Sequence, residues 1–173
     1  EIKFPIEVVR FLDDGNFKCV HMLKYENLFS EIISAENIFA AWGEFRRDKQ
    51  EKRDVLYFEH LLEENLFAIR DDLISKRYRH GPYKSFYITD PKQRHIHKAS
   101  VRDRVVHHAV FSALNPLFER SFIYDSYSCR LDKGTHKAVD RLEKFTRIVS
   151  KNYTKDCWAL KCDIKQFFAS VDH

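Results

Sequence analysis

The stretch from Cys157 to His173, which reads CWALKCDIKQFFASVDH, constrains the fold more than any other. Cys157 to Cys162 is short, apolar and partly aromatic, which predicts a buried strand, and Asp163 stands where that strand should end. Strand carboxyl ends in an open α/β sheet face the ligand crevice, so an acid there can hold a divalent cation against a phosphate. The alternative is a strand followed by a helical turn that Asp163 caps.

The composition is that of a folded protein. The 173 residues are 44% hydrophobic and 14% aromatic, enough to bury a core. No apolar run approaches the roughly 20 residues that a membrane span needs, and no secretory signal pattern is visible. We therefore expect a cytoplasmic protein with no membrane partner. The four cysteines include no C-x-x-C pair, so we expect reduced thiols in the core rather than zinc or disulfides.

The positive charge is unevenly distributed. A net charge of +4 does not by itself indicate a nucleic-acid partner. Between Lys76 and His108, however, nine Lys or Arg residues and five histidines stand against only two acids, Asp90 and Asp103. One region is therefore strongly basic while its flanks are nearly balanced.

Residues 1–21 precede the only methionine, Met22. Their apolar and aromatic residues predict a short hairpin around Asp14-Gly15-Asn16. The alternative is that this segment is a non-native or upstream extension and that Met22 is the natural start.

Residues 24–76 are predicted to be helical because apolar residues recur at helical spacing in three runs. The runs begin at Lys24, after Ser34 and at Asp54. We expect these stripes to form a core rather than a ligand site. The residues expected to share core faces are Leu28, Phe29, Ile32 and Ile33 in the first run, Ile38, Phe39, Trp42 and Phe45 in the second, and Leu56, Phe58, Leu61, Leu62, Leu66, Ile69 and Leu73 in the third.

A β-hairpin with a basic tip is predicted after Gly81-Pro82, which breaks the helical pattern. Tyr83 to Thr89 alternates aromatic and polar residues, Asp90 to Gln93 has turn chemistry, and Arg94 to Lys98 alternates again. Such a tip could close over an anion, although an ordinary charged hairpin is the alternative.

The next segment predicts a helix from Ser100, a candidate N-cap, to about Asn115. Arg102 and Arg104 stand in its first turn, where cations are unfavourable to the helix dipole. We therefore expect them to pair with an outside anion or with Asp103.

Two pairs of histidines could be metal ligands. His95 and His97 share one face of a predicted strand, and His107 and His108 adjoin on a helix. No third ligand is evident, so surface or RNA-facing histidines are expected.

Three segments, in this order, resemble bacterial reverse transcriptases. YRHGPYKSFYITDPKQRHIHKASVRDRVVHHAV resembles the fingers, in which a P-K-x-R-x-I hairpin precedes a D-R-V-V-x-H-A helix. SFIYDSYSCRLDKGTHKAVDRLEKF resembles the following block, S-Y-x-x-R-x-x-K-G-T-H, and DIKQFFASVDH resembles palm motif A, with Val171 in place of Ile. The sequence CRLDKGTH most resembles the corresponding block in the reverse transcriptases of diversity-generating retroelements. Group II intron maturases, which more often carry G-F-R-P-G-R-S there, are next closest.

The resemblance implies roles for individual residues. Asp163 would bind both catalytic Mg²⁺ ions, and the carbonyl of Ile164 would contact the ion that arrives with the dNTP. Phe168, with Phe167 beside it, would stack under the incoming sugar and exclude a 2′-hydroxyl. The triphosphate would be gripped by Lys92 and Arg94.

A template or nucleotide pocket is implied as well. It would involve Arg130, Lys133, Gly134, Arg102 and Arg104. Gly134 would let the backbone turn ahead of a helix that is capped by Thr135.

The predicted fold class is α+β. Residues 22–80 would form an N-terminal helical region, residues 81–156 the fingers, and residues 157–173 the first strand of a right-hand polymerase palm, which would lack neighbours and expose an edge. The Y-x-D-D carboxylates of the later palm and a thumb are missing from this sequence, so we expect no polymerisation by residues 1–173 alone.

The partners implied for the complete enzyme are an RNA template, a DNA or RNA primer and, in diversity-generating retroelements, an accessory protein that helps engage the RNA. A second reading is a non-catalytic RNA-binding module whose binding weakens with salt. A third reading, a purely structural helical domain, explains the helices but not the series Lys92, Arg94 and Asp163.

Overall fold

The computed structural model describes residues 5–11, 17–24 and 27–165, with only the backbone given for the first two ranges. The chain divides into two compact units, Glu1–Phe122 and Ile123–His173. This division falls inside the range 81–156 that the sequence assigned to the fingers. The two units are described separately below.

The first unit begins with an antiparallel hairpin of β1 (Pro5–Phe11) and β2 (Phe17–Lys24). The register runs from Pro5 opposite Lys24 to Phe11 opposite Phe17, with a shift at Val8/Val9 that is typical of a β-bulge. The predicted hairpin is therefore confirmed. Its expected turn, Asp14-Gly15-Asn16, lies outside the described residues.

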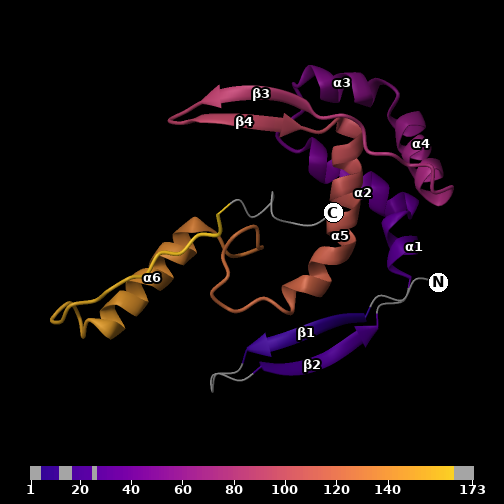
Figure 1. The fold of residues 1–173 in the computed structure, drawn as a ribbon. Coiled ribbons are helices and arrows are strands. Elements are labelled where there is room, and N and C mark those ends of the chain that lie inside the picture. The colour runs from indigo at the N-terminus through magenta and orange to yellow at the C-terminus, as the bar shows by residue number, and fades with distance from the viewer. Residues whose placement is uncertain (1–4, 12–16, 25–26, 166–173) are drawn as a thin grey trace. The chain divides into compact units, whose positions relative to one another are not determined.

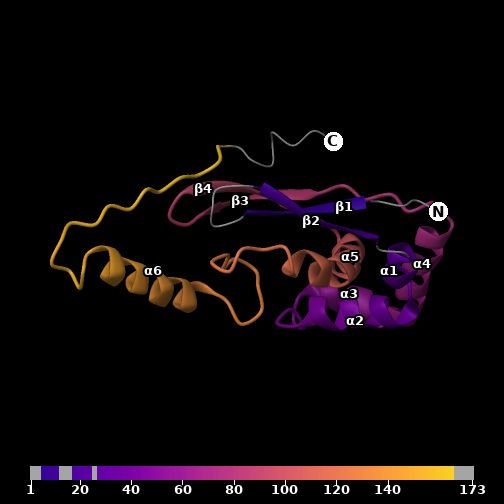
Figure 2. The same cartoon turned by 90° about the horizontal axis from the view of Figure 1, so that it is seen from below.

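Helices make up most of the first unit (Figures 1 and 2). The three predicted helical runs are confirmed, but the first begins at Leu28 and not at Lys24, which ends β2. The third is interrupted at Leu61, whose backbone is not helical. Ser34 caps α2 by accepting a hydrogen bond from the Asn37 N–H, at 3.1 Å. The helices are α1 (Leu28–Ile32), α2 (Ala35–Arg46), α3 (Arg53–His60), α4 (Leu62–Ile74) and α5 (Val101–Glu119).

A hydrophobic core lies where α2, α3 and α4 pack with α5. Trp42 stacks on Phe58 with ring centroids 5.2 Å apart, and Phe45 is 1% exposed. Most of the core side chains are apolar, because burying apolar surface is the main favourable contribution to folding. The core residues on the helices are Ile38, Ala41, Trp42, Phe45, Val55, Phe58, Leu66, Ile69, Val101, Val105, Val106 and Ala109.

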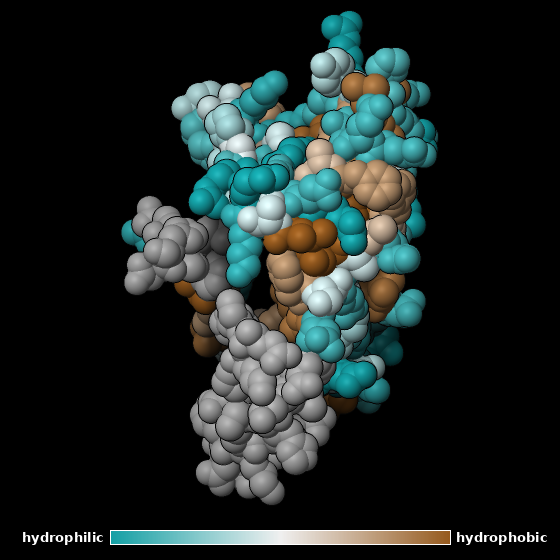
Figure 3. Space-filling model, turned by 90° about the vertical axis from the view of Figure 1, so that its right-hand side faces the viewer, coloured by the Kyte–Doolittle hydropathy of each residue, from teal (hydrophilic) through white to brown (hydrophobic). Residues whose placement is uncertain are grey.

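Several residues expected in the core are exposed instead. Leu56 and Leu61 are about half exposed, because they lie beside the core-facing series Val55, Phe58, Leu62, Leu66 and Ile69, which keeps helical spacing. Phe29 is also half exposed, and Phe39 lies outside the core against Phe67, edge to face at 5.9 Å. Hydrophobic side chains accordingly reach the surface among hydrophilic ones (Figure 3).

The predicted basic hairpin is confirmed as β3 (Lys84–Thr89) and β4 (Gln93–Lys98). The strands are antiparallel, from Lys84 opposite Lys98 to Thr89 opposite Gln93. The helix that follows is also confirmed: the Ser100 side chain caps α5, which continues through Pro116 beyond the predicted end at Asn115.

The second unit contains α6 (Thr135–Val149). Gly134 precedes it at φ 133°, a conformation that favours glycine, as predicted. The predicted cap by Thr135 is wrong, because Gly134 occupies the N-cap position and Thr135 is already helical.

The buried strand predicted for Cys157–Cys162 is also wrong. These residues form no regular structure, and Trp158 and Leu160 are about nine-tenths exposed. A strand needs a hydrogen-bonded neighbour, and none pairs with this segment among the residues that the structure describes. The thiols of Cys129, Cys157 and Cys162 are free but exposed, so the expectation of buried cysteines is wrong for these three.

Within the ranges that the structure describes, no helix combines the length and the apolar character that crossing a membrane requires.

Candidate nucleic-acid interface

The hairpin β3–β4 places Lys92 and Arg94 at its tip. Lys92 lies in the turn and Arg94 lies on β4 opposite Ile88. Both side chains are exposed, and neither forms an ion pair or side-chain hydrogen bond with any residue that the structure describes. The two cations that the sequence assigned to a triphosphate are therefore adjacent and available to an anion.

Arg102 and Arg104 behave differently, because each meets a carboxylate of the same unit. Arg102 Nη2 lies 2.7 Å from Asp72 Oδ2, and Arg104 Nη2 lies 3.0 Å from Asp54 Oδ2. Asp54 also accepts from Lys98 Nζ at 2.7 Å. Burial raises the pKa of Asp54, but the hydrogen bond from Lys98 and the charges of Lys98 and Arg104 outweigh it and lower that pKa below its usual value.

Asp103 is the buried centre of the turn that leads into α5. Its carboxylate, 1% exposed, accepts hydrogen bonds from Tyr78 Oη at 2.8 Å, Ser100 Oγ at 2.6 Å and the Gly81 N–H at 3.2 Å. Burial raises the pKa of Asp103, but these bonds and the charge of His80 lower it below the usual value. Burial and the same carboxylate raise the pKa of Tyr78.

The nine cations between Lys76 and His108 thus fall into two groups. Four are ion-paired with Asp54 or Asp72. The other five form no ion pair with any residue in the described ranges, so they are the basic charge open to phosphates. These five open cations are Lys76, Arg79, Lys84, Lys92 and Arg94.

The histidines of this region contact aromatic rings. His95 stacks on Tyr87 at a centroid distance of 4.5 Å, and its ring lies 4.3 Å from that of His97. His108 is partly buried, unlike these exposed rings. Its burial, as the larger cause, and the charge of Lys49, as the second cause, lower its pKa. Within the described ranges, no three His, Cys, Asp or Glu side chains are placed to hold a metal ion.

In the second unit, Arg130 and Lys133 bind the loop ahead of α6. Arg130 Nη1 donates to the carbonyls of Ile123 and Ser126, at 2.9 and 3.1 Å. Lys133 Nζ donates to the Tyr124 carbonyl at 2.6 Å and lies 3.7 Å from the centroid of the Tyr124 ring. Both residues therefore order their own loop, a role that sequence reasoning missed.

Asp163 and Ile164 lie in the exposed, irregular segment of the second unit. Phe167 and Phe168 lie outside the described residues. The structure thus holds Lys92 and Arg94 on one hairpin and Arg130, Lys133 and Gly134 in one loop, whereas Arg102 and Arg104 pair with different carboxylates.

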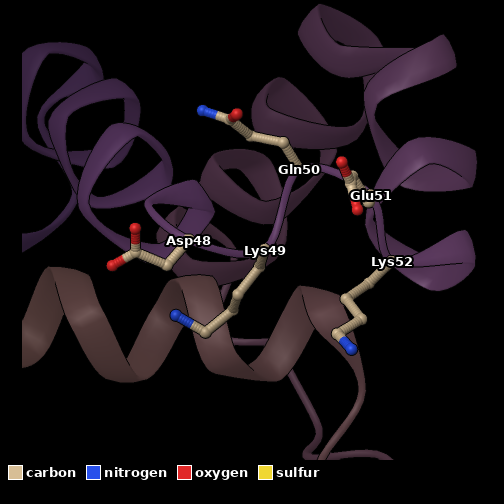
Figure 4. A pocket seen from close by; sticks show the side chains of 5 residues that line it. All are labelled: Asp48, Lys49, Gln50, Glu51 and Lys52. Atoms are coloured by element: carbon tan, nitrogen blue, oxygen red, sulfur yellow. The ribbon is translucent and has the colours of Figure 1, made fainter.

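A shallow pocket in the first unit involves none of the predicted residues. It is lined by the α2–α3 connection, Asp48 to Lys52 (Figure 4). Its Lys49 Nζ donates to the carbonyls of Phe45 and Arg47, at 2.9 and 3.3 Å. The pocket is a surface depression in which the Lys49 side chain donates hydrogen bonds to the backbone.

Comparison with known proteins gives two distant similarities. The chain is 28% identical over 110 residues to Protein YkfC of Escherichia coli, covering 62% of this chain and 28% of that protein. It is 23% identical over 117 residues to the mitochondrial protein Nuclear intron maturase 2 of Arabidopsis thaliana, covering 58% of this chain and 15% of that protein. No family model matches the sequence. The chain thus spans less than a third of either relative, and the similarity to an intron maturase favours the reverse transcriptases without separating their subclasses.

Proposed function

We propose that this chain is part of an RNA-directed DNA polymerase, which adds dNTPs to a primer 3′ end on an RNA template. The observation that supports this proposal most is the exposed pair Lys92 and Arg94, which a β-hairpin holds within the segment that resembles the P-K-x-R-x-I motif. The similarity to an intron maturase supports the same family. We place the enzyme nearest the reverse transcriptases of diversity-generating retroelements because of the sequence CRLDKGTH.

The proposed chemistry assigns Asp163 to two Mg²⁺ ions, together with the carbonyl of Ile164. Mg²⁺ prefers carboxylate and carbonyl oxygens, and Asp163 is exposed and can reach such ions. The ions would activate the primer hydroxyl and stabilise the departing pyrophosphate. Lys92 and Arg94 would hold the triphosphate, while Phe168, beside Phe167, would exclude a 2′-hydroxyl.

The remaining parts of the proposal concern partners. The complete enzyme would work in the cytoplasm on an RNA template with a DNA or RNA primer and with an accessory protein. Arg130, Lys133 and Gly134 would shape the template pocket by ordering the loop ahead of α6. Arg102 and Arg104 would contribute indirectly, because their ion pairs with Asp72 and Asp54 fix the start of α5.

The test is primer extension on an RNA template by the whole protein that contains this chain. Asp163→Asn should abolish extension, because the amide cannot supply the anionic oxygens that the metal ions need. Asp156→Asn, an exposed carboxylate of the same segment, is the matched control and should retain activity. Full extension by the Asp163 variant would contradict the proposed role.

The intron-maturase type is the second candidate within the family, favoured by the Arabidopsis similarity. A non-catalytic RNA-binding module is the candidate outside it, favoured by the five open cations. Binding by phosphate contacts should weaken strongly between about 50 and 200 mM salt. An RNA affinity that stays constant over this range would exclude the binding module.

A further inference from the structure

Six exposed rings form a continuous series of contacts across the first unit. We call this series, His107, His80, Tyr83, His97, His95 and Tyr87, the ring stripe. His107 on α5 stacks on His80 at 5.3 Å, and His80 lies 4.7 Å from Tyr83. Tyr83 meets His97 edge to face at 6.3 Å. The ring of His95 lies 4.3 Å from that of His97 and stacks on the ring of Tyr87 at 4.5 Å, which ends the stripe.

The ring stripe occupies one face of the β3–β4 hairpin. Alternation along each strand places Tyr87, His95 and His97 on the same face, because Tyr87 is opposite His95 in the register. Arg94 belongs to the other face, together with Phe86 and Ile96. The ring stripe is therefore a different surface from the one that carries Arg94.

Exposure shows that the ring stripe is not part of the core. Tyr83 is 56% and Tyr87 is 64% exposed, and all four histidines are exposed. Aromatic rings that stack on one another while open to solvent present flat faces and edges to a ligand. Because nearby rings hold each other in place, little side-chain freedom remains to be lost when a ligand binds.

The charges around the ring stripe favour a polyanion. Arg79 adjoins His80 in the sequence, and Lys92 lies in the turn beyond Tyr87. These two belong to the five open cations defined above, whereas Lys84 lies on the face of Arg94. Of the two acids in this region, Asp103 is buried and hydrogen-bonded, and Asp90 is exposed in the turn beside Lys92.

We propose that the ring stripe binds an unpaired RNA strand, whose bases stack on the exposed rings and whose phosphates meet Arg79 and Lys92. Bases in a duplex are already stacked on their neighbours, so only an unpaired strand can use the rings. The choice of RNA over DNA rests on the proposed function.

The experiment is a binding titration of the 173-residue chain with a labelled, unpaired RNA of about 12 nucleotides, a length typical of single-strand sites. Tyr83→Ala and Tyr87→Ala should each weaken binding roughly tenfold, because each removes one stacking ring. Tyr83→Phe and Tyr87→Phe should bind like the unaltered chain, since they keep the ring. Tyr57→Ala removes an exposed ring of α3 outside the stripe and should also leave binding unchanged.

Three outcomes would overturn the proposal. Equal weakening by Tyr57→Ala would show that the stripe has no special role, and equal affinity for duplex RNA would show binding through phosphates alone. Equal affinity for unpaired DNA would remove the assignment to RNA. The titration uses neither Mg²⁺ nor dNTP and measures binding to the ring stripe, whereas primer extension measures polymerisation, so failure of the ring stripe and failure of the polymerase proposal are distinguishable.

Discussion

Helices α2 and α6 are both amphipathic, but among the residues that the structure describes only α2 has its apolar face buried. Phe45 of α2 is 1% exposed, whereas Phe145 of α6 is 41% exposed. Among the described residues, α6 buries no side chain at all. An apolar stripe is enough to predict a helix, but most helical stability in a protein comes from what the stripe packs against.

Local contacts of charged groups partly replace packing around α6. Arg141 Nε lies 2.7 Å from Asp125 Oδ1, and its guanidinium lies 4.4 Å from the Phe145 centroid. The hydrogen bond from Arg141 lowers the pKa of Asp125. Exposed pairs of this kind contribute little to stability, so the two units should differ strongly in how easily they open.

The largest expected difference is in amide hydrogen exchange. Core amides of α2 and α5 should exchange at least about 100-fold more slowly than those of α6, because the core helices open only with most of the unit. Exchange followed by mass spectrometry measures both in one sample. Equal protection in α5 and α6 would remove the contrast between the units.

A matched pair of substitutions should sharpen the same contrast. Phe45→Ala should lower the free energy of unfolding by about 3–5 kcal/mol, because it leaves a cavity among Trp42 and its neighbours. Phe145→Ala makes the same chemical change on a partly exposed site and should cost much less. Urea unfolding measures both, and similar losses would show that α6 is packed as firmly as α2.

The next largest loss of stability is expected from removing a buried hydrogen-bond acceptor. Asp103→Ala should cost about 2–4 kcal/mol, because Tyr78, Ser100 and the Gly81 N–H lose their acceptor. The matched change in the second unit is Asp125→Ala, which should not shift the urea midpoint of the first unit. A stable Asp103 variant would mean that water replaces the carboxylate.

The stability of the first unit should depend on pH through the carboxyl group of Asp103. Since folding lowers the pKa of Asp103, its contribution to stability is fully present above the ordinary aspartate value and is lost as the pH falls through the lowered pKa. The unaltered chain should therefore lose stability from about pH 5 downward. Asp103→Asn should flatten this fall, and an unchanged slope would assign the acid sensitivity to other carboxylates such as Asp54.

The smallest effect is expected from Arg141→Gln. This change removes the pair with Asp125 and the contact with Phe145, both on the surface. We expect no measurable change in the urea midpoint but faster exchange at the start of α6. A shifted midpoint would show that this surface pair couples the loop to the rest of the chain.

Sequence periodicity predicted most of the first unit because its elements are defined locally. Ser100 caps α5 as expected, and the β3–β4 hairpin follows from alternation around Asp90. The break at Leu61 was not predictable, because the apolar residues that face the core keep helical spacing across it. The strand predicted for Cys157–Cys162 was wrong because a strand is not defined locally. Its sequence pattern forms a strand only beside a hydrogen-bonded neighbour.

The candidate interface could be predicted only in part. The exposure of Lys92 and Arg94 was predictable, since turn residues lie on the surface. The partners of Arg102 and Arg104 were not, because Asp72 and Asp54 are distant in the sequence. The strand alternation of Tyr87, His95 and His97 was a signal for part of the ring stripe, but His80 and His107 join it only through the fold.

The ion pairs of Asp54 and Asp72 set a limit on how many counterions a bound nucleic acid can displace. Four of the nine local cations already have a protein anion, so they release no salt ions when a strand arrives. With five open cations at about 0.7 ions each, the logarithm of the affinity should fall against the logarithm of salt with a slope no steeper than about −3.5. The two carboxylates therefore act as internal counterions, which make this surface less salt-sensitive than its sequence charge indicates.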